Sequence, residues 1–234
     1  MLKCKDKEIV VPGEILCEGM EFLPSYGTYR ADKVIRSSIV GLVNIDGKVI
    51  KIMPTSGRYF PRRGDTIIGR VFDITMNGWR LNINSPYSSF LTMMEASSQF
   101  IRKGSDLSKI IPMEGYMVGK ITNVTGQNLI DLTMKGPGLR KLDGGVIVNV
   151  NSSKVSRIIG RQGSMIKLIK EATGCFITVG QNGRVWLSGE AKNEVIAINA
   201  IELINEKGHK KGLTDEVKKF LEKETGKKLE VSNV

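Results

Sequence analysis

The stretch Ile-Ile-Gly-Arg-Gln-Gly-Ser-Met at residues 158–165 decides the fold of the C-terminal part of this 234-residue chain. Two glycines three positions apart, Gly160 and Gly163, separate two segments with helical periodicity. Because glycine has no Cβ, a phosphate can approach the backbone closely there. The amides that begin the second helix add donors and partial positive charge, and Arg161 adds a full charge. The stretch therefore predicts a helix–loop–helix unit that can hold the backbone of a single-stranded nucleic acid.

The residues around this loop predict the element order βααββα. A strand is expected over 145–150, a helix ending at Ile159 with Ser152 or Ser153 as its cap, and a second helix over 165–173 capped by Ser164 and stopped by Gly174. Strands over 176–179 and 184–188 then flank an Asn182-Gly183 hairpin turn. The pattern places two helices and a sheet around the glycine loop.

Two more helices are predicted after these strands. A long helix over about 190–207 places an apolar stripe on one face, as expected of a helix lying on a sheet. Its members are Val195, Ile198, Ala200 or Ile201, and Ile204. A short helix over 214–224, with Thr214 as its N-cap, is predicted to be a peripheral appendage. The third domain is predicted to span residues 140–234.

The middle of the chain, residues 59–139, predicts a small closed β-barrel. Alternating segments over 64–74 and 79–84 are joined near Asn77-Gly78, a patch at Phe90-Leu91 follows, and strands over 116–121 and 129–133 are joined across 125–127. Five short strands in so short a block favour a closed barrel, which removes exposed sheet edges. Trp79 in this block, like Trp186 further on, is predicted to pack in the interior rather than to stack on bases.

Residues 1–58 predict an N-terminal β-domain. Short β-rich runs lie at 34–35, 39–45 and 49–52, and Asp46-Gly47 between the last two is a hairpin signal. The segment from Pro54 to Pro61 is predicted to be a connector, because proline removes backbone donors. The fold class is thus multidomain and mainly β, with a C-terminal α+β domain.

Composition limits the possible functions. The chain has 35 basic and 24 acidic residues, a net charge of +11, which favours a polyanionic partner such as nucleic acid. Three cysteines without a CxxC pair argue against a zinc site or a disulfide framework, and no metal or other cofactor is expected. The only histidine, His209, lies in a basic run and is expected to be solvated. No apolar run is long enough to span a membrane, so a cytoplasmic protein is expected.

The glycine loop in its βααββα frame resembles a KH domain. The middle block, with Gly64-Asp65-Thr66-Ile67 and Asn77-Gly78-Trp79, is similar to the OB-fold RNA-binding domain named after ribosomal protein S-one. It departs from that pattern because Asn77 occupies a position that is often aromatic and because the block has no histidine. A cationic funnel in place of base stacking is therefore expected.

An N-terminal β-domain, this barrel and a KH domain in that order resemble the archaeal exosome RNA-binding cap subunits. Further matching strings lie at 83–87 and 102–109. The resemblance implies a non-catalytic subunit that captures single-stranded RNA and guides its 3′ end into a hexameric phosphorolytic ring for 3′-to-5′ degradation. It also implies three copies per ring, with the N-terminal domain docked on ring subunits.

The candidate RNA-binding residues fall into two groups. The KH group surrounds the glycine loop and comprises Lys154, Arg157, Ile159, Gly160, Arg161, Gln162, Gly163 and Ser164. The barrel group is cationic and comprises Arg80, Arg102, Lys103 and Lys109.

Two alternatives compete with this interpretation. A nuclease would need a site, and the only candidates for holding Mg²⁺ are Asp65, Asp73 and Asp131, which are better explained as ordinary strand and turn residues. A ribosome- or translation-associated RNA-binding protein or RNA chaperone could use the same two modules, since fold alone does not fix function. No catalytic residues are predicted.

Overall fold

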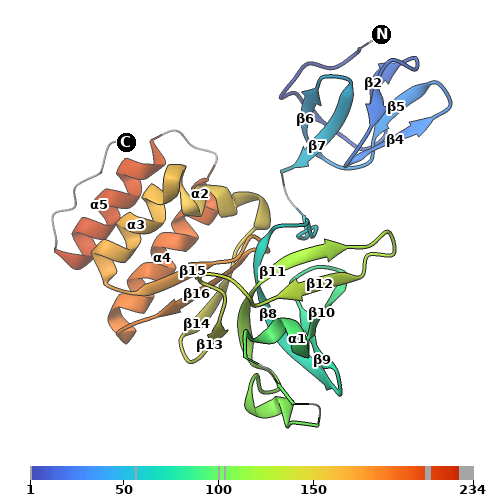
Figure 1. Ribbon diagram of the computed structural model, residues 1–234. Helices are drawn as coiled ribbons and strands as arrows, with labels where there is room; N and C mark the ends of the chain where they lie inside the picture. Colours follow the sequence, from blue (N-terminus) through green and yellow to red (C-terminus); the bar gives the residue numbers. More distant parts are fainter. Residues whose placement is uncertain (1, 56, 100, 103, 209–211, 227–234) are drawn as a thin grey trace. The chain divides into compact units, whose positions relative to one another are not determined.

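The computed structural model describes residues 2–55, 57–99, 101–102, 104–208 and 212–226. The chain divides into two compact units, residues 1–57 and residues 58–234 (Figure 1). The architecture is mainly β, with the helices concentrated at the C-terminal end of the chain. In the described part, none of the helices is long and apolar enough to cross a membrane.

The first unit consists of two small sheets. One has the order β2-β5-β4 and the other the order β1-β6-β7-β3. The strands are β1 (Ile9–Val10), β2 (Ile15–Glu18), β3 (Leu23–Pro24), β4 (Thr28–Ala31), β5 (Val34–Ser37), β6 (Gly41–Asp46) and β7 (Val49–Pro54). Apolar side chains from both sheets, among them Leu16, Ile35, Val43 and Ile50, form one buried core.

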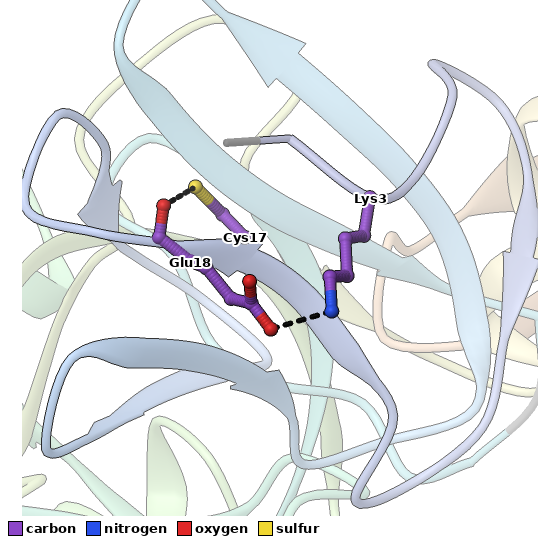
Figure 2. Close-up of polar contacts among 3 residues, drawn as sticks. All are labelled: Lys3, Cys17 and Glu18. Carbon is purple, nitrogen blue, oxygen red and sulfur yellow. Dashed lines mark hydrogen bonds and ion pairs between the residues drawn. The ribbon is translucent and has the colours of Figure 1, made fainter.

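An ion pair ties the start of the chain to β2. The ammonium of Lys3 contacts the carboxylate of Glu18, as Figure 2 shows. The hydrogen bond from Lys3 lowers the pKa of Glu18 below its usual value. The thiol of Cys17 is buried and donates to the carbonyl oxygen of Glu18 at 3.5 Å. Because both partners of the ion pair are about half exposed, the pair adds little to stability.

The hairpin predicted in this unit is present, but its turn lies one residue further along. Asp46 pairs with Val49 across β6 and β7, so the two loop residues are Gly47 and Lys48. Only Gly47 has a positive φ, 57°, whereas a type I′ turn needs positive φ at both positions. Asp46 therefore ends a strand and does not form the turn.

The second unit begins with the predicted closed five-stranded barrel of OB type. Its strands are β8 (Thr66–Thr75), β9 (Gly78–Asn82), β10 (Ser88–Thr92), β11 (Tyr116–Val124) and β12 (Ile130–Thr133). The sheet runs β12-β10-β9-β8-β11, and pairing of β12 with β11 closes it. A short helix, α1 (Met93–Ala96), follows β10. Trp79 is fully buried and donates from Nε1 to the carbonyl of Ile111, which confirms its interior position.

The predicted βααββα order is also present. It comprises β14 (Val146–Asn149), α2 (Val155–Ile159), α3 (Ser164–Thr173), β15 (Phe176–Val179), β16 (Arg184–Ser188) and α4 (Ala191–Lys207). The antiparallel sheet has the order β14-β16-β15, and the helices pack against it (Figure 1). A two-residue strand, β13 (Lys141–Leu142), pairs with β11 and so extends the barrel sheet.

Several predicted helix caps are wrong. Asn151, not Ser152 or Ser153, caps the turn before α2 by accepting from the backbone N–H of Ser153. Ser164 is the first residue of α3, and Gly163, with a left-handed conformation, precedes it. Asn151 takes the place of the serines before α2 because its side-chain oxygen accepts the capping hydrogen bond. Gly163 takes the place of Ser164 before α3 because glycine adopts the left-handed conformation without steric cost.

The last two helices also differ from prediction. In α4 the buried residues are Ala197, Ala200, Ile201 and Ile204, while Val195 is 55% exposed. Helix α5 (Leu213–Thr225) has Gly212 as its N-cap, so Thr214 lies in its first turn. It is not a peripheral appendage, because Leu213, Val217 and Leu221 are buried in the same core as α3 and α4.

The KH sheet and the barrel are joined by a buried polar contact. The side chain of Asn182, fully buried in the β15–β16 loop, donates from Nδ2 to the carbonyls of Ile68 and Ile83 and accepts from the N–H of Ile68. Arg184 donates to the carbonyls of Ile68 and Asn82 and to Oδ1 of Asn82. Burial lowers the pKa of the Arg184 guanidinium, and the acceptors around it are neutral oxygens.

An apolar cluster surrounds this polar contact. Ile68 and Val118 of the barrel pack with Leu142 and Trp186. The indole Nε1 of Trp186 donates to the carbonyl of Gly144, and the guanidinium of Arg140 lies 5.4 Å from the ring centroid. The predicted interior role of Trp186 is thus confirmed, with the barrel as its partner.

We predict that Asn182→Ala destabilises the protein by about 2–3 kcal/mol, because it leaves the buried N–H of Ile68 without its acceptor. The matched control is Gln181→Ala in the same loop, whose side chain is exposed. Urea unfolding of both variants measures the effect. Equal midpoints for the two variants would contradict the assigned role of Asn182.

Candidate nucleic-acid interface

The glycine loop has a backbone that most residues adopt only at a cost. Gly160 has φ 76° and ψ 174°, Gln162 has φ 49° and Gly163 has φ 80°. At Gly160 a Cβ would lie 2.7 Å from the backbone N of Met165 and 2.8 Å from its Cβ. Gly160 is therefore required by the fold itself, since the chain turns back there onto the start of α3.

Gly163 is constrained by conformation alone. A Cβ built there would come no closer than 3.8 Å to its nearest neighbour, a methyl group of Ile166. The approach to the start of α3 therefore remains open on the side of Gly163. This is the geometry in which a phosphate can reach the amides of a helix N-terminus.

The polar side chains of the loop face solvent. Arg161, Gln162 and Ser164 are exposed, and so is Arg157 on the preceding helix α2. Ile159 differs, because its half-buried side chain packs against the core of the KH helices. The loop thus presents the guanidinium group of Arg161 and the amide of Gln162 directly before the first turn of α3.

Lys154 has a partner within the fold. Its ammonium donates to the carbonyl of Asn205 at 2.5 Å, which ties the turn before α2 to the last part of α4. The side chain of Asn205 in turn accepts from the N–H of Asn151. Lys154 therefore holds the two helices together, and its contact with RNA stays a prediction.

The barrel candidates lie in separate segments. Arg80 on β9 is exposed and its Nη1 lies 3.6 Å from a carboxylate oxygen of Asp73 on β8. Arg102 is exposed, and Lys109 is exposed at the end of a short 3-10 turn over 107–109. Asp106 caps that turn, and hydrogen bonds from Ser108 lower the pKa of its carboxyl. Lys103 lies outside the described residues, as does His209.

The carboxylates considered for Mg²⁺ have other partners. Asp65 accepts from the hydroxyl of Tyr59 at 2.6 Å, Asp73 faces Arg80, and Asp131 lies 3.4 Å from the amide of Asn123. Among the residues that the structure describes, no group of three or more His, Cys, Asp or Glu side chains is placed to hold a metal ion.

Sequence reasoning missed the residues that orient this interface. The sequence indicates only a turn at Asn182, because its partners Ile68 and Ile83 are more than 95 positions away in the chain. The only signal in the sequence is the Asn182-Gly183 pair, which also describes a simple hairpin. A Cβ at Gly180 would lie 2.8 Å from the N of Ile68, so close approach to the barrel explains that glycine.

A closed OB-type barrel followed by a KH domain defines a protein class built from two modules that bind single-stranded nucleic acids. Comparison with known proteins extends this assignment. Residues 9–46 match the family model for the N-terminal region of the exosome complex exonuclease RRP4, and residues 145–204 match the KH domain model.

Curated relatives match over nearly the whole chain. The exosome complex component Rrp4 of Methanothermobacter thermautotrophicus is 39% identical over 231 residues, which cover 99% of this chain and 73% of the relative. That of Methanothermus fervidus is 41% identical over 222 residues, which cover 94% of this chain and 98% of the relative. A crystal structure assigned to an exosome complex RNA-binding protein is 33% identical with a TM-score of 0.64, covering 72% of this chain and 97% of that one. The chain belongs to the family of archaeal Rrp4 exosome components.

We predict that Gly160→Ala lowers stability more than Gly163→Ala. Both variants place a Cβ at a positive φ, which costs about 1 kcal/mol, but only the Gly160 variant also forces a Cβ against the backbone of Met165. Thermal unfolding measured by circular dichroism compares the two. The reverse order of melting temperatures would contradict the loop geometry described above.

Proposed function

We propose that this protein is a non-catalytic RNA-binding cap subunit of an archaeal exosome. It captures single-stranded RNA and guides the 3′ end into a phosphorolytic ring, where partner subunits degrade the RNA in the 3′-to-5′ direction. The observation that carries the proposal is the solvent-facing loop at residues 160–163, with Arg161 and Gln162 exposed beside the N-terminus of α3.

The chemistry of this loop suits a phosphate backbone. A helix N-terminus offers N–H donors and partial positive charge, and an arginine can form two parallel hydrogen bonds with a phosphate. Neither feature distinguishes one base from another, so binding through this loop is largely independent of sequence. Such binding suits a subunit that passes many different RNAs onward.

The N-terminal unit is proposed to dock on the ring. Ile9, Leu42 and Met53 are cross-strand neighbours on β1, β6 and β7, and they form an apolar row. Ile9 is 66% exposed and Met53 is 54% exposed. A row of this kind suits a protein neighbour better than a phosphate strand. The proposed partner is a hexameric ring with three copies of this subunit, in the cytoplasm.

The proposal contains no catalytic role for this chain. Two contacts support the absence of a catalytic role: Asp65 accepts a hydrogen bond from Tyr59, and Asp73 pairs with Arg80. Carboxylates that contact these partners are poorly placed to bind one Mg²⁺ ion together. Degradation is therefore assigned to the ring.

We predict that replacing Arg161 and Gln162 together with aspartate weakens RNA binding at least tenfold, because it places negative charge at a phosphate site. The matched control is Lys192→Asp with Asn193→Asp in the first turn of α4, which changes the net charge equally. Fluorescence anisotropy with a labelled single-stranded RNA measures both. Equal dissociation constants for the loop variant and the wild type would remove the loop from the RNA-binding site.

In the same titration, the wild type should show log K falling against log salt concentration with a slope near −3, as expected if about four phosphates of a single strand are neutralised. A slope near zero would contradict capture by charge.

We predict that the purified protein leaves a labelled RNA intact in the presence of Mg²⁺ and phosphate, and that degradation appears only when ring subunits are added. Gel analysis of the RNA over time gives the readout. Degradation by the chain alone would overturn the non-catalytic role. Association with ribosomes and not with a phosphorolytic ring in a native pull-down would favour a translation-associated protein instead.

A further inference from the structure

Helix α2, which leads into the glycine loop, is too short to hold its own position. It spans only Val155–Ile159, and helices of this length are unstable in water without tertiary contacts. Two of its side chains, Val155 and Ile158, are buried in the core of the KH helices. Because Gly160 follows α2 directly, a tilt of this helix would displace the loop at residues 160–163. The contacts that hold α2 in place therefore also fix the loop.

Two polar contacts join the turn before α2 to the last turn of α4. The ammonium of Lys154 donates to the backbone carbonyl of Asn205 at 2.5 Å, and the backbone N–H of Asn151 donates to Oδ1 of Asn205 at 3.1 Å. The side chain of Asn151 also accepts from the N–H and the hydroxyl of Ser153, so it fixes the turn itself. The three residues Asn151, Lys154 and Asn205 are here named the α2–α4 joint.

The ammonium of Lys154 lies where a cation is favoured. The last carbonyl groups of a helix lack intrahelical donors and carry partial negative charge, and Asn205 is in the last turn of α4, which ends at Lys207. The aliphatic stem of Lys154 lies against the same helix end, since a Cβ built at Gly208 would be 3.5 Å from its Cδ. Lys154 is accordingly half-buried, whereas Arg161 in the loop is exposed. The charge of Lys154 is therefore used within the fold.

We infer that Lys154 and Asn205 are positioning residues for RNA binding. They hold α2, and with it the glycine loop, in the arrangement that accepts a phosphate, and neither of them contacts the RNA. A protein that populates its binding-competent arrangement only in part binds with an affinity reduced by that fraction, so the joint raises affinity by raising the fraction. This role takes the place of the direct RNA contact that the sequence predicts for Lys154. The inference rests on the proposed function and adds Asn205, which lies outside the predicted site.

The test measures RNA affinity and its salt dependence for full-length variants in the titration described above. Lys154→Met removes the ammonium and keeps the stem, and Asn205→Leu removes the side-chain acceptor at similar volume. Each should weaken binding about 3- to 10-fold, as expected when one hydrogen bond that supports the competent arrangement is lost. The salt slope should not change, and Lys154→Arg, which keeps a cationic donor, should bind more tightly than Lys154→Met. Lys192→Met, at the exposed start of α4, is the control with equal charge loss and should bind like the wild type.

A second measurement uses the wild type, so it decides the question even if a variant fails to fold. The NMR signal of Nζ in Lys154 is recorded with and without the labelled RNA. It should stay unchanged on RNA addition, because the ammonium remains on the carbonyl of Asn205. A large shift of this signal would indicate that the ammonium moves to a phosphate and would contradict the inference.

Circular dichroism and melting temperatures verify that each variant is folded at the assay temperature. If Lys154→Met makes the salt slope shallower by about 0.7, the value for one phosphate on a single strand, Lys154 contacts RNA and the inference is wrong. If the joint variants bind RNA as tightly as the wild type while the Arg161–Gln162 variant binds weakly, the joint does not position the loop and the proposed function stands. If the wild type itself does not bind RNA, both the inference and the proposed function fail.

Discussion

The position of the glycine loop relative to the barrel depends on one buried side-chain amide. Asn182 donates to two carbonyls of the barrel and accepts from one of its N–H groups, so its donor and acceptor atoms are used at once. A loop that could slide along the barrel would leave these groups without partners in an interior that excludes water. An unpaired buried polar group costs about 1–3 kcal/mol, and this cost favours a single arrangement of the two modules.

Arg184 and Trp186 complete this junction in different ways. The guanidinium of Arg184 is surrounded by neutral oxygen atoms, so its charge is compensated by dipoles, and its carbon Cζ lies 6.0 Å from the ring centroid of Tyr116. Trp186 contributes apolar area beside it. Polar groups specify the geometry, and the apolar cluster supplies the favourable free energy of burial. The loop at 160–163 and the barrel strands are consequently presented to a ligand in one fixed relation.

The sequence predicted the element order well because periodicity and turn residues are local. The βααββα order and the five-stranded barrel follow from alternation and glycine positions that a few neighbouring residues define. Local errors shift a turn or a helix cap by one or two residues, whereas the larger omissions depend on contacts between residues that are distant in the chain. Asn182 lies in the predicted turn, but its contacts with the barrel are not visible in the sequence because the partners are far away in the chain. Helix α5 is predicted to be peripheral because its burial against α3 and α4 is tertiary. Likewise, the hydrogen bond from Tyr59 to Asp65 is not visible in the sequence, which indicates only a connector from Pro54 to Pro61.

The central claim is that the KH helices and the barrel form one rigid body that offers its RNA-binding groups in a fixed geometry. Residual dipolar couplings of backbone amides in the barrel strands and in the KH helices, measured on the whole protein with and without RNA, test it most directly. The account predicts that one alignment tensor fits both sets of amides in both states. Two different tensors for the barrel and the KH helices in the free protein would contradict it.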